Sequence, residues 1–127
     1  VVGPMTGGIL LAYEVGKKLD TKAIFTERVD GKMKFRRGFE VKPDDRVLIV
    51  EDIISTGGSV QEVIDEVRRF KAEIVGVGCL VDRSGGRVDF GIPLRPLVKM
   101  DVVSFKPDEV PDWLAKIPVT KPGSTNK

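Results

Sequence analysis

The sequence has no histidine and a single cysteine, Cys79. One cysteine excludes a disulfide framework and any zinc site built from cysteines. The absence of histidine excludes histidine metal ligands, a histidine general base, and the nucleophile pairs Ser-His and Cys-His. Any chemistry therefore has to use carboxylates, hydroxyls, amines, guanidinium groups or the backbone. We expect a reduced, cytoplasmic setting, because disulfides belong to oxidising compartments.

No long apolar run, no signal peptide and no strong excess of charge is visible in the sequence. None of its apolar stretches approaches the roughly 20 residues of a membrane span. Its net charge of +2, from 21 basic and 19 acidic residues, does not fit a protein that coats nucleic acid. The 127 residues, 41% of them apolar, suffice for one domain with a real core. We therefore expect a single domain over residues 1–127, with no nucleic-acid or membrane partner.

Short β-branched runs alternate with helical periods along the chain, which is typical of parallel βαβ units. We predict strands ending at Val2 and over residues 23–27, 47–50, 74–81 and 97–105. Asp30-Gly31 lies between two strand-like stretches and predicts a hairpin turn. The expected fold is an α/β domain with a central, mostly parallel β-sheet that is flanked by helices and carries a flexible β-hairpin loop.

Two helices are predicted between these strands. The first, over residues 9–19, has an apolar face made of Leu11, Ala12, Val15 and Leu19. The second, over residues 59–71, has a buried face made of Val60, Val63, Ile64 and Val67. Ser59 and Glu62 have the spacing of a capping box, so we expect Ser59 to cap the second helix.

The two ends of the sequence carry separate expectations. The chain opens on Val1, without an initiating methionine and in mid-strand, so we expect its N-terminal segment to be missing. Residues 107–127 form a proline-rich tail, with one short helix expected around Trp113. The last residues, 123–127, are expected to fray, because chain termini are ordered only where they are tied down.

Residues 47–59 read Val-Leu-Ile-Val-Glu-Asp-Ile-Ile-Ser-Thr-Gly-Gly-Ser. A buried strand runs into two adjacent acids, and two more hydrophobic residues lead to a hydroxyl- and glycine-rich turn that opens a helix. Such a turn, at the carboxyl end of a parallel strand, offers backbone N–H groups, hydroxyls and a helix N-terminus to a phosphate. Glu51 and Asp52 repel a phosphate but accept hydrogen bonds from ribose hydroxyls. The motif therefore predicts a phosphate beside a ribose.

This motif resembles the binding motif for 5-phosphoribosyl 1-pyrophosphate (PRPP) in type I phosphoribosyltransferases. The resemblance implies that the 5-phosphate lies on the turn and that the two acids bind the ribose hydroxyls. The implied PRPP-binding residues are Glu51, Asp52, Ile53, Ile54, Ser55, Thr56, Gly57, Gly58 and Ser59. The alternative is that residues 47–59 are only structural, an acidic strand end followed by a capped helix. This alternative does not explain the unbroken order of hydrophobic, acidic and glycine-rich elements. A P-loop is excluded because no lysine follows the glycines. A Rossmann fingerprint is excluded because the glycines do not have its spacing.

The segment Gly3–Ile9 is similar to the pyrophosphate-binding loop of the same family. Its glycines allow the backbone to approach a ligand closely. The resemblance implies that Thr6 and Gly7 contact pyrophosphate, although Gly7 stands where many family members have a lysine. A strand-to-helix turn with three glycines also occurs without any ligand, so this segment gains its meaning from the motif at residues 47–59.

Two further segments are similar to orotate phosphoribosyltransferases within this family. One is Val81–Gly86, with its Asp-Arg pair, and the other is Pro118–Ser124, which ends in Lys-Pro-Gly-Ser. The resemblance implies that Ser55 and Arg83 contact orotate. A guanidinium suits this anionic planar ring, which carries a carboxylate and carbonyls. The alternative for the arginine is a surface pair with the preceding aspartate.

The basic segment 28–38 corresponds to the flexible catalytic loop of the family, which closes over the site of a neighbouring subunit. The resemblance therefore implies a homodimer. Basic side chains would neutralise the charge on departing pyrophosphate in a closed site. The catalytic residues implied are Arg28, Lys32, Lys34 and Asp52. The histidine that this loop usually carries is absent, and Arg36 and Arg37 fit a solvated charge run equally well.

The resemblance implies transfer of ribose 5-phosphate from PRPP to orotate, which yields orotidine 5′-phosphate and pyrophosphate in pyrimidine biosynthesis. Mg²⁺ would arrive bound to PRPP, and no metal site made of protein side chains is predicted. Two alternatives stay open. One is a transcriptional regulator that keeps the fold and senses PRPP or a nucleotide. The other is a purine or uracil phosphoribosyltransferase, which shares the PRPP motif but does not explain the Asp-Arg pair or the Lys-Pro-Gly-Ser tail.

Overall fold

The computed structural model describes residues 1–103, 105–106 and 108–118. Strands and helices alternate along the chain, as the apolar pattern predicts. In chain order the elements are β1 (Val2–Pro4), α1 (Gly7–Lys18), β2 (Ile24–Val29), β3 (Lys32–Phe35), β4 (Arg46–Ile54), α2 (Gly58–Arg69), β5 (Glu73–Asp82), β6 (Leu94–Lys99) and α3 (Asp112–Ala115). Within the described residues, no helix is long and apolar enough to cross a membrane.

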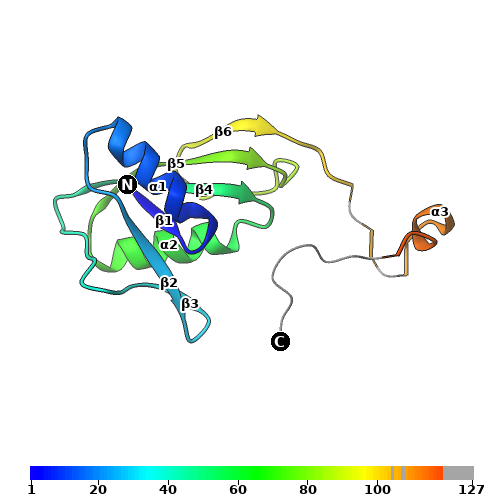
Figure 1. Ribbon diagram of the computed structural model, residues 1–127, viewed down its shortest axis with the longest axis horizontal. Coiled ribbons are helices and arrows are strands. Elements are labelled where there is room, and N and C mark those ends of the chain that lie inside the picture. The colour runs from blue at the N-terminus through cyan, green and yellow to red at the C-terminus, as the bar shows by residue number, and fades with distance from the viewer. Residues whose placement is uncertain (104, 107, 119–127) are drawn as a thin grey trace.

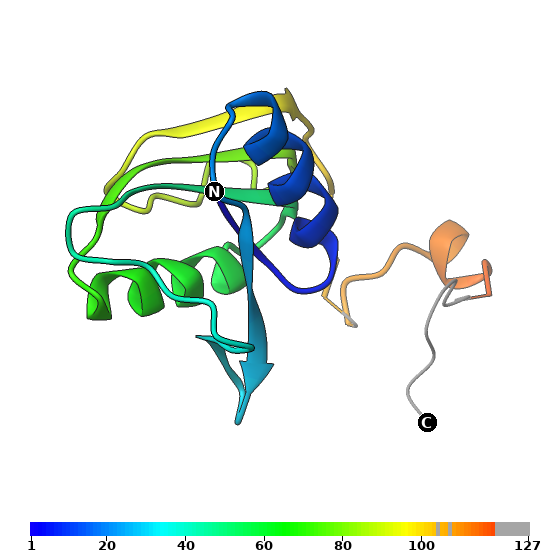
Figure 2. The same ribbon diagram turned by 60° about the vertical axis from the view of Figure 1, so that its left-hand side comes forward.

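Within the residues that the structure describes, the strands form one six-stranded sheet in the order β3-β2-β1-β4-β5-β6. Every neighbouring pair is parallel except β2 and β3, which form an antiparallel hairpin. Helix α1 covers one face of the sheet and α2 covers the other (Figure 1 and Figure 2). The predicted α/β fold with a central, mostly parallel sheet is therefore confirmed.

The main core lies between α2 and the sheet. The predicted apolar face of α2 is confirmed, since its four residues are at most 1% exposed: Val60, Val63, Ile64 and Val67. They belong to one buried cluster with Ile49 of β4 and Val77 of β5. Burial of each such side chain contributes roughly 1.5–3 kcal/mol to folding. This packing fixes α2, and with it the turn that precedes α2, against the carboxyl ends of the strands.

Helix α1 packs on its face of the sheet less deeply than α2 does. Ala12 is buried and Leu11 and Val15 are half-buried, as the predicted apolar face requires. Leu19 was predicted on that face but is 57% exposed, because the helix ends at Lys18 and Leu19 is its C-cap residue. Two buried glycines allow the close packing of this helix: Gly8 lies against Pro4 of β1, and Gly16 lies against Ala23, just before β2.

Two strands differ most in extent from the prediction. Strand β4 continues to Ile54, through the two acids, because it pairs with β5 along almost its whole length, up to Ile54 opposite Asp82. Strand β6 begins earlier and ends earlier than the predicted strand at 97–105, because Leu94 already pairs with Val77 of β5. In both cases the neighbouring strand, and not the local apolar run, sets the ends.

The capping box predicted for α2 is wrong. The helix begins at Gly58, and its N-cap residue is Gly57, which lies in the left-handed region at φ 78°. No side-chain hydrogen bond caps this helix. Glu62, which was expected to turn back toward Ser59, lies against the hairpin and accepts hydrogen bonds from the side chain of Arg28 and from a backbone N–H of β3. Glu62 therefore pairs with Arg28 of the hairpin and not with the N-terminus of its own helix.

The β2–β3 hairpin turns at Asp30-Gly31, as predicted. Both residues have positive φ angles, 49° and 78°, as a type I′ turn requires. Because the last residue of β1, Pro4, lies opposite Thr26, the rest of β2 extends beyond that end of the sheet (Figure 2). The short helix predicted around Trp113 is confirmed as α3. The fraying predicted for residues 123–127 lies outside the described residues.

Candidate active site

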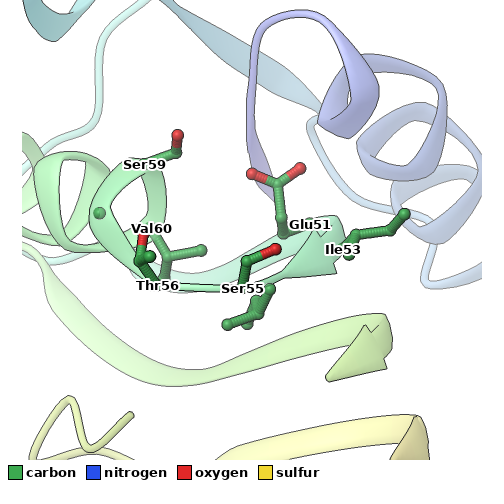
Figure 3. A pocket seen from close by; sticks show the side chains of 9 residues that line it. Glu51, Ile53, Ser55, Thr56, Ser59 and Val60 are labelled. Carbon is green, nitrogen blue, oxygen red and sulfur yellow. The ribbon is translucent and has the colours of Figure 1, made fainter. Parts of the chain in front are cut away.

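A pocket lies where β4 ends and α2 begins. It has a volume of about 190 Å³, which holds roughly six water molecules at the density of liquid water. Figure 3 shows the side chains that surround it. The lining residues are Glu51, Ile53, Ile54, Ser55, Thr56, Gly57, Gly58, Ser59 and Val60. The structure therefore brings together all but one of the predicted PRPP-binding residues of the segment 51–59, and the exception, Asp52, lies beside the pocket in the same strand.

The turn at residues 55–57 leaves the start of α2 open to a ligand. Gly57 is required there, because its positive φ disfavours other residues and a Cβ would lie within about 3.1 Å of Val88 and Phe90. The N–H groups of the first helical turn have no side-chain cap. Uncapped N–H groups together with the positive end of the helix dipole form a binding site for an anion. The hydroxyls of Ser55, Thr56 and Ser59 add further donors on the same wall.

Glu51 and Asp52 form the acidic side of the site. Glu51 is only 7% exposed, and burial raises the pKa of its carboxyl to about 7, with a hydrogen bond to Asp52 and the charge of Asp52 adding to the effect. The backbone N–H of Asp52 donates to Glu51 Oε1 over 3.0 Å, and the N–H of Ile53 donates to Asp52 Oδ1 over 2.7 Å. Near neutral pH, Glu51 can therefore both accept a hydrogen bond and donate one, as a sugar hydroxyl does.

The glycine-rich loop between β1 and α1 packs directly against these acids. A Cβ on Gly7 would lie 2.1 Å from Asp52 Oδ2, so the loop backbone touches the carboxylate. A Cβ on Gly3 would lie 2.1 Å from the carbonyl oxygen of Gly8, so the loop is also folded tightly on itself. The predicted pyrophosphate-binding residues Thr6 and Gly7 thus lie beside the predicted ribose-binding residues, although the two segments are far apart in sequence.

Arg83 directly follows β5 and contacts the pocket through Ser55. Its Nε donates to Ser55 Oγ over 2.6 Å, and its backbone N–H donates to the carbonyl of Ile54 over 2.9 Å. The alternative of a surface pair with Asp82 is not seen: the buried Asp82 accepts the N–H of Ser84 over 2.9 Å, and hydrogen bonding from Ser84 holds the pKa of Asp82 below its ordinary value. The two residues predicted to contact orotate are therefore in direct contact with each other.

The predicted catalytic residues of the hairpin do not line the pocket. Arg28 Nη1 lies 2.9 Å from Glu62 Oε2, and Lys34 Nζ lies 2.9 Å from Glu66 Oε2. Lys32 is exposed beside the hairpin turn. Of the two arginines that could have been solvated, Arg36 is exposed, whereas Arg37 pairs with Glu27. Arg28 and Lys34 of the hairpin are thus both paired with carboxylates of α2.

Sequence reasoning did not single out Glu66 and gave Glu62 a different role. Both carboxylates lie on the polar side of α2, one helical turn apart. The signal that could have identified them is this spacing, together with a basic segment that carries Arg28, Lys34 and little acid to balance them. Within the described residues, no group of three or more acidic, histidine or cysteine side chains is placed to hold a metal ion.

Comparison with known proteins agrees with this geometry. The family model described as the phosphoribosyl transferase domain matches residues 1–90. Orotate phosphoribosyltransferase of Carboxydothermus hydrogenoformans is 53% identical over 124 residues, which are 98% of this chain and 65% of that protein. The same enzyme of Thermotoga maritima is 48% identical, over 98% of this chain and 66% of that protein. The chain therefore spans about 65% of the length of these relatives.

Solved structures with the same fold include adenine and orotate phosphoribosyltransferases. Adenine phosphoribosyltransferase of Rhodothermus marinus superposes with a TM-score of 0.62 at 26% identity, over 78% of this chain and 68% of that one. Orotate phosphoribosyltransferase of Mycobacterium tuberculosis, in complex with inorganic phosphate, gives a TM-score of 0.60 at 25% identity, over 78% and 59%. With its sheet order, the glycine-rich turn before α2 and these similarities, the chain belongs to the phosphoribosyltransferase family, and its fold is the type I phosphoribosyltransferase fold.

Proposed function

We propose that the protein is an orotate phosphoribosyltransferase, which transfers ribose 5-phosphate from PRPP to orotate and releases pyrophosphate. The observation that carries this proposal is the hydrogen bond between Arg83 and Ser55, which holds a guanidinium at the edge of a phosphate-cradling pocket. A cation at that position favours an anionic base over a neutral one. Relatives about 50% identical that bear the name of this enzyme support the same proposal. The product, orotidine 5′-phosphate, would enter pyrimidine biosynthesis.

PRPP would bind along the carboxyl ends of β1 and β4. Its 5-phosphate would lie on the turn formed by Ser55, Thr56, Gly57, Gly58 and Ser59, where N–H groups and hydroxyls converge. Its ribose hydroxyls would bond to Glu51 and Asp52, with Ile53 and Ile54 forming the strand edge beneath them. Its pyrophosphate would lie against the Thr6–Gly7 loop, which touches Asp52 and thereby lies next to the ribose.

Mg²⁺ fits this site as part of the substrate and not as a resident ion. Carboxylate oxygens are suitable ligands for Mg²⁺. This site has two carboxylates, Glu51 and Asp52. Within the described residues no third acidic group is placed to complete a metal site with them. Two carboxylates leave most positions of an octahedral ion to oxygens from elsewhere, and PRPP offers pyrophosphate and ribose oxygens. Bound Mg²⁺ would neutralise part of the charge that develops on the leaving pyrophosphate.

The reaction breaks the bond between the anomeric carbon and pyrophosphate and forms a bond from that carbon to a ring nitrogen of orotate. That nitrogen loses its proton, which the departing pyrophosphate can accept. The transition state resembles an oxocarbenium ion, so the protein has to hold two reactants in line and stabilise charge. Arg83 and Ser55 would orient the base, and the acids would lie beside the positive sugar. Arg28, Lys32 and Lys34 would reach pyrophosphate only after the hairpin moves, and in a homodimer they would act on the neighbouring subunit.

A base-specificity assay tests the proposal. Purified protein is given PRPP and Mg²⁺ with orotate, uracil, hypoxanthine or adenine, and release of pyrophosphate is followed. Turnover is expected with orotate alone, because only this base carries a carboxylate for Arg83. Turnover with adenine or hypoxanthine alone would refute the assignment.

Two variants separate the two substrate subsites. Arg83→Ala is expected to raise KM for orotate about ten-fold or more with little change in KM for PRPP, since loss of a charge-assisted hydrogen bond costs about 1.5–3 kcal/mol. Asp52→Asn is expected to raise KM for PRPP and to leave that for orotate nearly unchanged. Equal effects of both variants on both substrates would contradict the division of roles.

A further inference from the structure

Strand β3 is an edge strand of the sheet. Two glutamates of helix α2 accept hydrogen bonds from backbone N–H groups on its outer side. The backbone N–H of Met33 donates to Glu62 Oε2 over 3.1 Å, and the N–H of Phe35 donates to Glu66 Oε1 over 3.3 Å. Residues two apart in a strand are separated by about 6.7 Å, and residues four apart in a helix by about 6 Å along the axis. The two spacings match, so the carboxylates meet consecutive outward-facing N–H groups of the hairpin.

The same two carboxylates hold the basic side chains of the hairpin. Arg28 Nη1 lies within 3.0 Å of both carboxylate oxygens of Glu62 and also donates to the carbonyl of Gly31 over 2.6 Å. Lys34 Nζ lies 2.9 Å from Glu66, which is only 5% exposed and is approached by Arg69 from within α2 at 2.8 Å. Hydrogen bonds from the hairpin hold the pKa of Glu66 below its ordinary value against the effect of its burial. Each glutamate thus binds one cation and one N–H of the hairpin.

This arrangement connects the hairpin to the pocket through one rigid helix. Helix α2 begins at Gly58 in the wall of the pocket, and Glu62 and Glu66 lie in its next two turns. Strand β3 contacts this helix through Met33 and Phe35, and the tip of the hairpin extends beyond the sheet (Figure 2). In this position Arg28 and Lys34 face carboxylates, and a carboxylate beside each cation repels any other anion that approaches it.

We propose that Glu62 and Glu66 are positioning residues that keep the hairpin docked on α2, and that their carboxylates occupy the places on Arg28 and Lys34 that pyrophosphate oxygens take during the reaction. The second half of this statement rests on the proposed function. The docked hairpin is then the resting state, and pyrophosphate competes with the two glutamates for the same cations. A ligand that binds only the released state has its affinity reduced by the fraction of molecules that are docked.

The sign of the effect follows from this competition. Weakening the docked state has to increase the affinity for pyrophosphate, whereas damage to a merely structural contact would lower it. Glu62→Gln removes the charge and keeps an oxygen that can accept the N–H of Met33. An ion pair as exposed as Arg28–Glu62 is worth about 0.2–1 kcal/mol, so the expected gain in pyrophosphate affinity is about three-fold. Glu66→Gln, in a buried pair, is expected to give a larger gain.

The experiment measures two quantities on the full chain of each variant. Calorimetry with Mg²⁺-pyrophosphate gives Kd, which is expected to fall about three-fold in Glu62→Gln. Trypsin without ligand is expected to cut after the basic residues of segment 28–37 about three-fold faster in this variant, because docking protects them. Glu73→Gln is the matched control, since its exposed pair with Arg46 lies at the other end of the sheet, and it should change neither quantity.

The outcomes are distinguishable. Unchanged cleavage and unchanged Kd in both Gln variants would overturn the proposal, and so would weaker pyrophosphate binding in a variant that melts at the wild-type temperature. Faster cleavage with tighter binding supports it. A wild-type protein that binds no pyrophosphate contradicts the proposed function and the exchange of anions, and the cleavage rates then decide on docking alone.

Discussion

The buried carboxyl of Glu51 predicts an unusual dependence of stability on pH. Burial raises the pKa of Glu51 from 4.5 to about 7 in the folded chain. Between these two values the native state keeps a proton that the unfolded state has lost. Because stability falls with rising pH wherever the native state binds more protons, the free energy of unfolding is expected to decrease from about pH 5 to about pH 8.

The size of the decrease follows from the pKa difference. One pKa unit corresponds to about 1.4 kcal/mol, so the loss attributable to Glu51 reaches up to about 3 kcal/mol once the native carboxyl is fully ionised. Glu66 and Asp82 do not contribute in this range, because the fold lowers their pKa values and the stability that they add is lost only in more acidic solution. Burial lowers the pKa of the amino terminus, whose contribution therefore opposes this decrease toward pH 8. The comparison with a variant, and not the wild-type slope alone, isolates Glu51.

Urea unfolding at several pH values tests this prediction. Glu51→Gln cannot ionise, so the variant is expected to be about as stable as the wild type near pH 5 and more stable by up to about 3 kcal/mol near pH 8. The difference between the two proteins isolates Glu51, since the amino terminus and every other group titrate in both. A difference between the two proteins that does not grow between these pH values would refute the reasoning.

Three further substitutions have defined outcomes. Gly3→Ala places a Cβ 2.1 Å from the carbonyl oxygen of Gly8, so the backbone has to move and urea unfolding should show a loss of about 2–4 kcal/mol. Ile64→Ala empties a fully buried position on α2 and should cost about 2–5 kcal/mol in the same assay. Asp82→Asn weakens the turn that orients Arg83, so steady-state kinetics should show a higher KM for orotate with KM for PRPP almost unchanged.

The turn that is proposed to bind the 5-phosphate could be predicted from sequence because all of its parts are neighbours in the chain. The apolar run of β4, the two acids, the glycines and the start of α2 follow one another between Val47 and Ser59, so no tertiary information is needed to assemble them. The apolar face of α2 was predictable for the same reason, since helical spacing alone groups Val60, Val63, Ile64 and Val67 on one side.

The partners of Glu62 and Glu66 could not be predicted in this way. A serine followed three residues later by a glutamate satisfies the capping-box pattern, and only the hairpin, which is distant in sequence, supplies the cation and N–H that Glu62 prefers. The extent of β4 was missed on similar grounds. Two adjacent acids read locally as the end of a strand, yet the ladder to β5 continues past them to Ile54.

The order of the strands explains why three separate motifs lie together at one end of the sheet. Strand β4 lies between β1 and β5, and all three are parallel, so the loops that follow them emerge side by side. Ile54 is opposite Asp82, and the next residue of each strand, Ser55 and Arg83, therefore meet. In the proposed function, pyrophosphate lies after β1, the sugar phosphate after β4 and the base after β5. The sugar is then flanked by its leaving group on one side and its nucleophile on the other, which is the arrangement that an in-line displacement at the anomeric carbon requires.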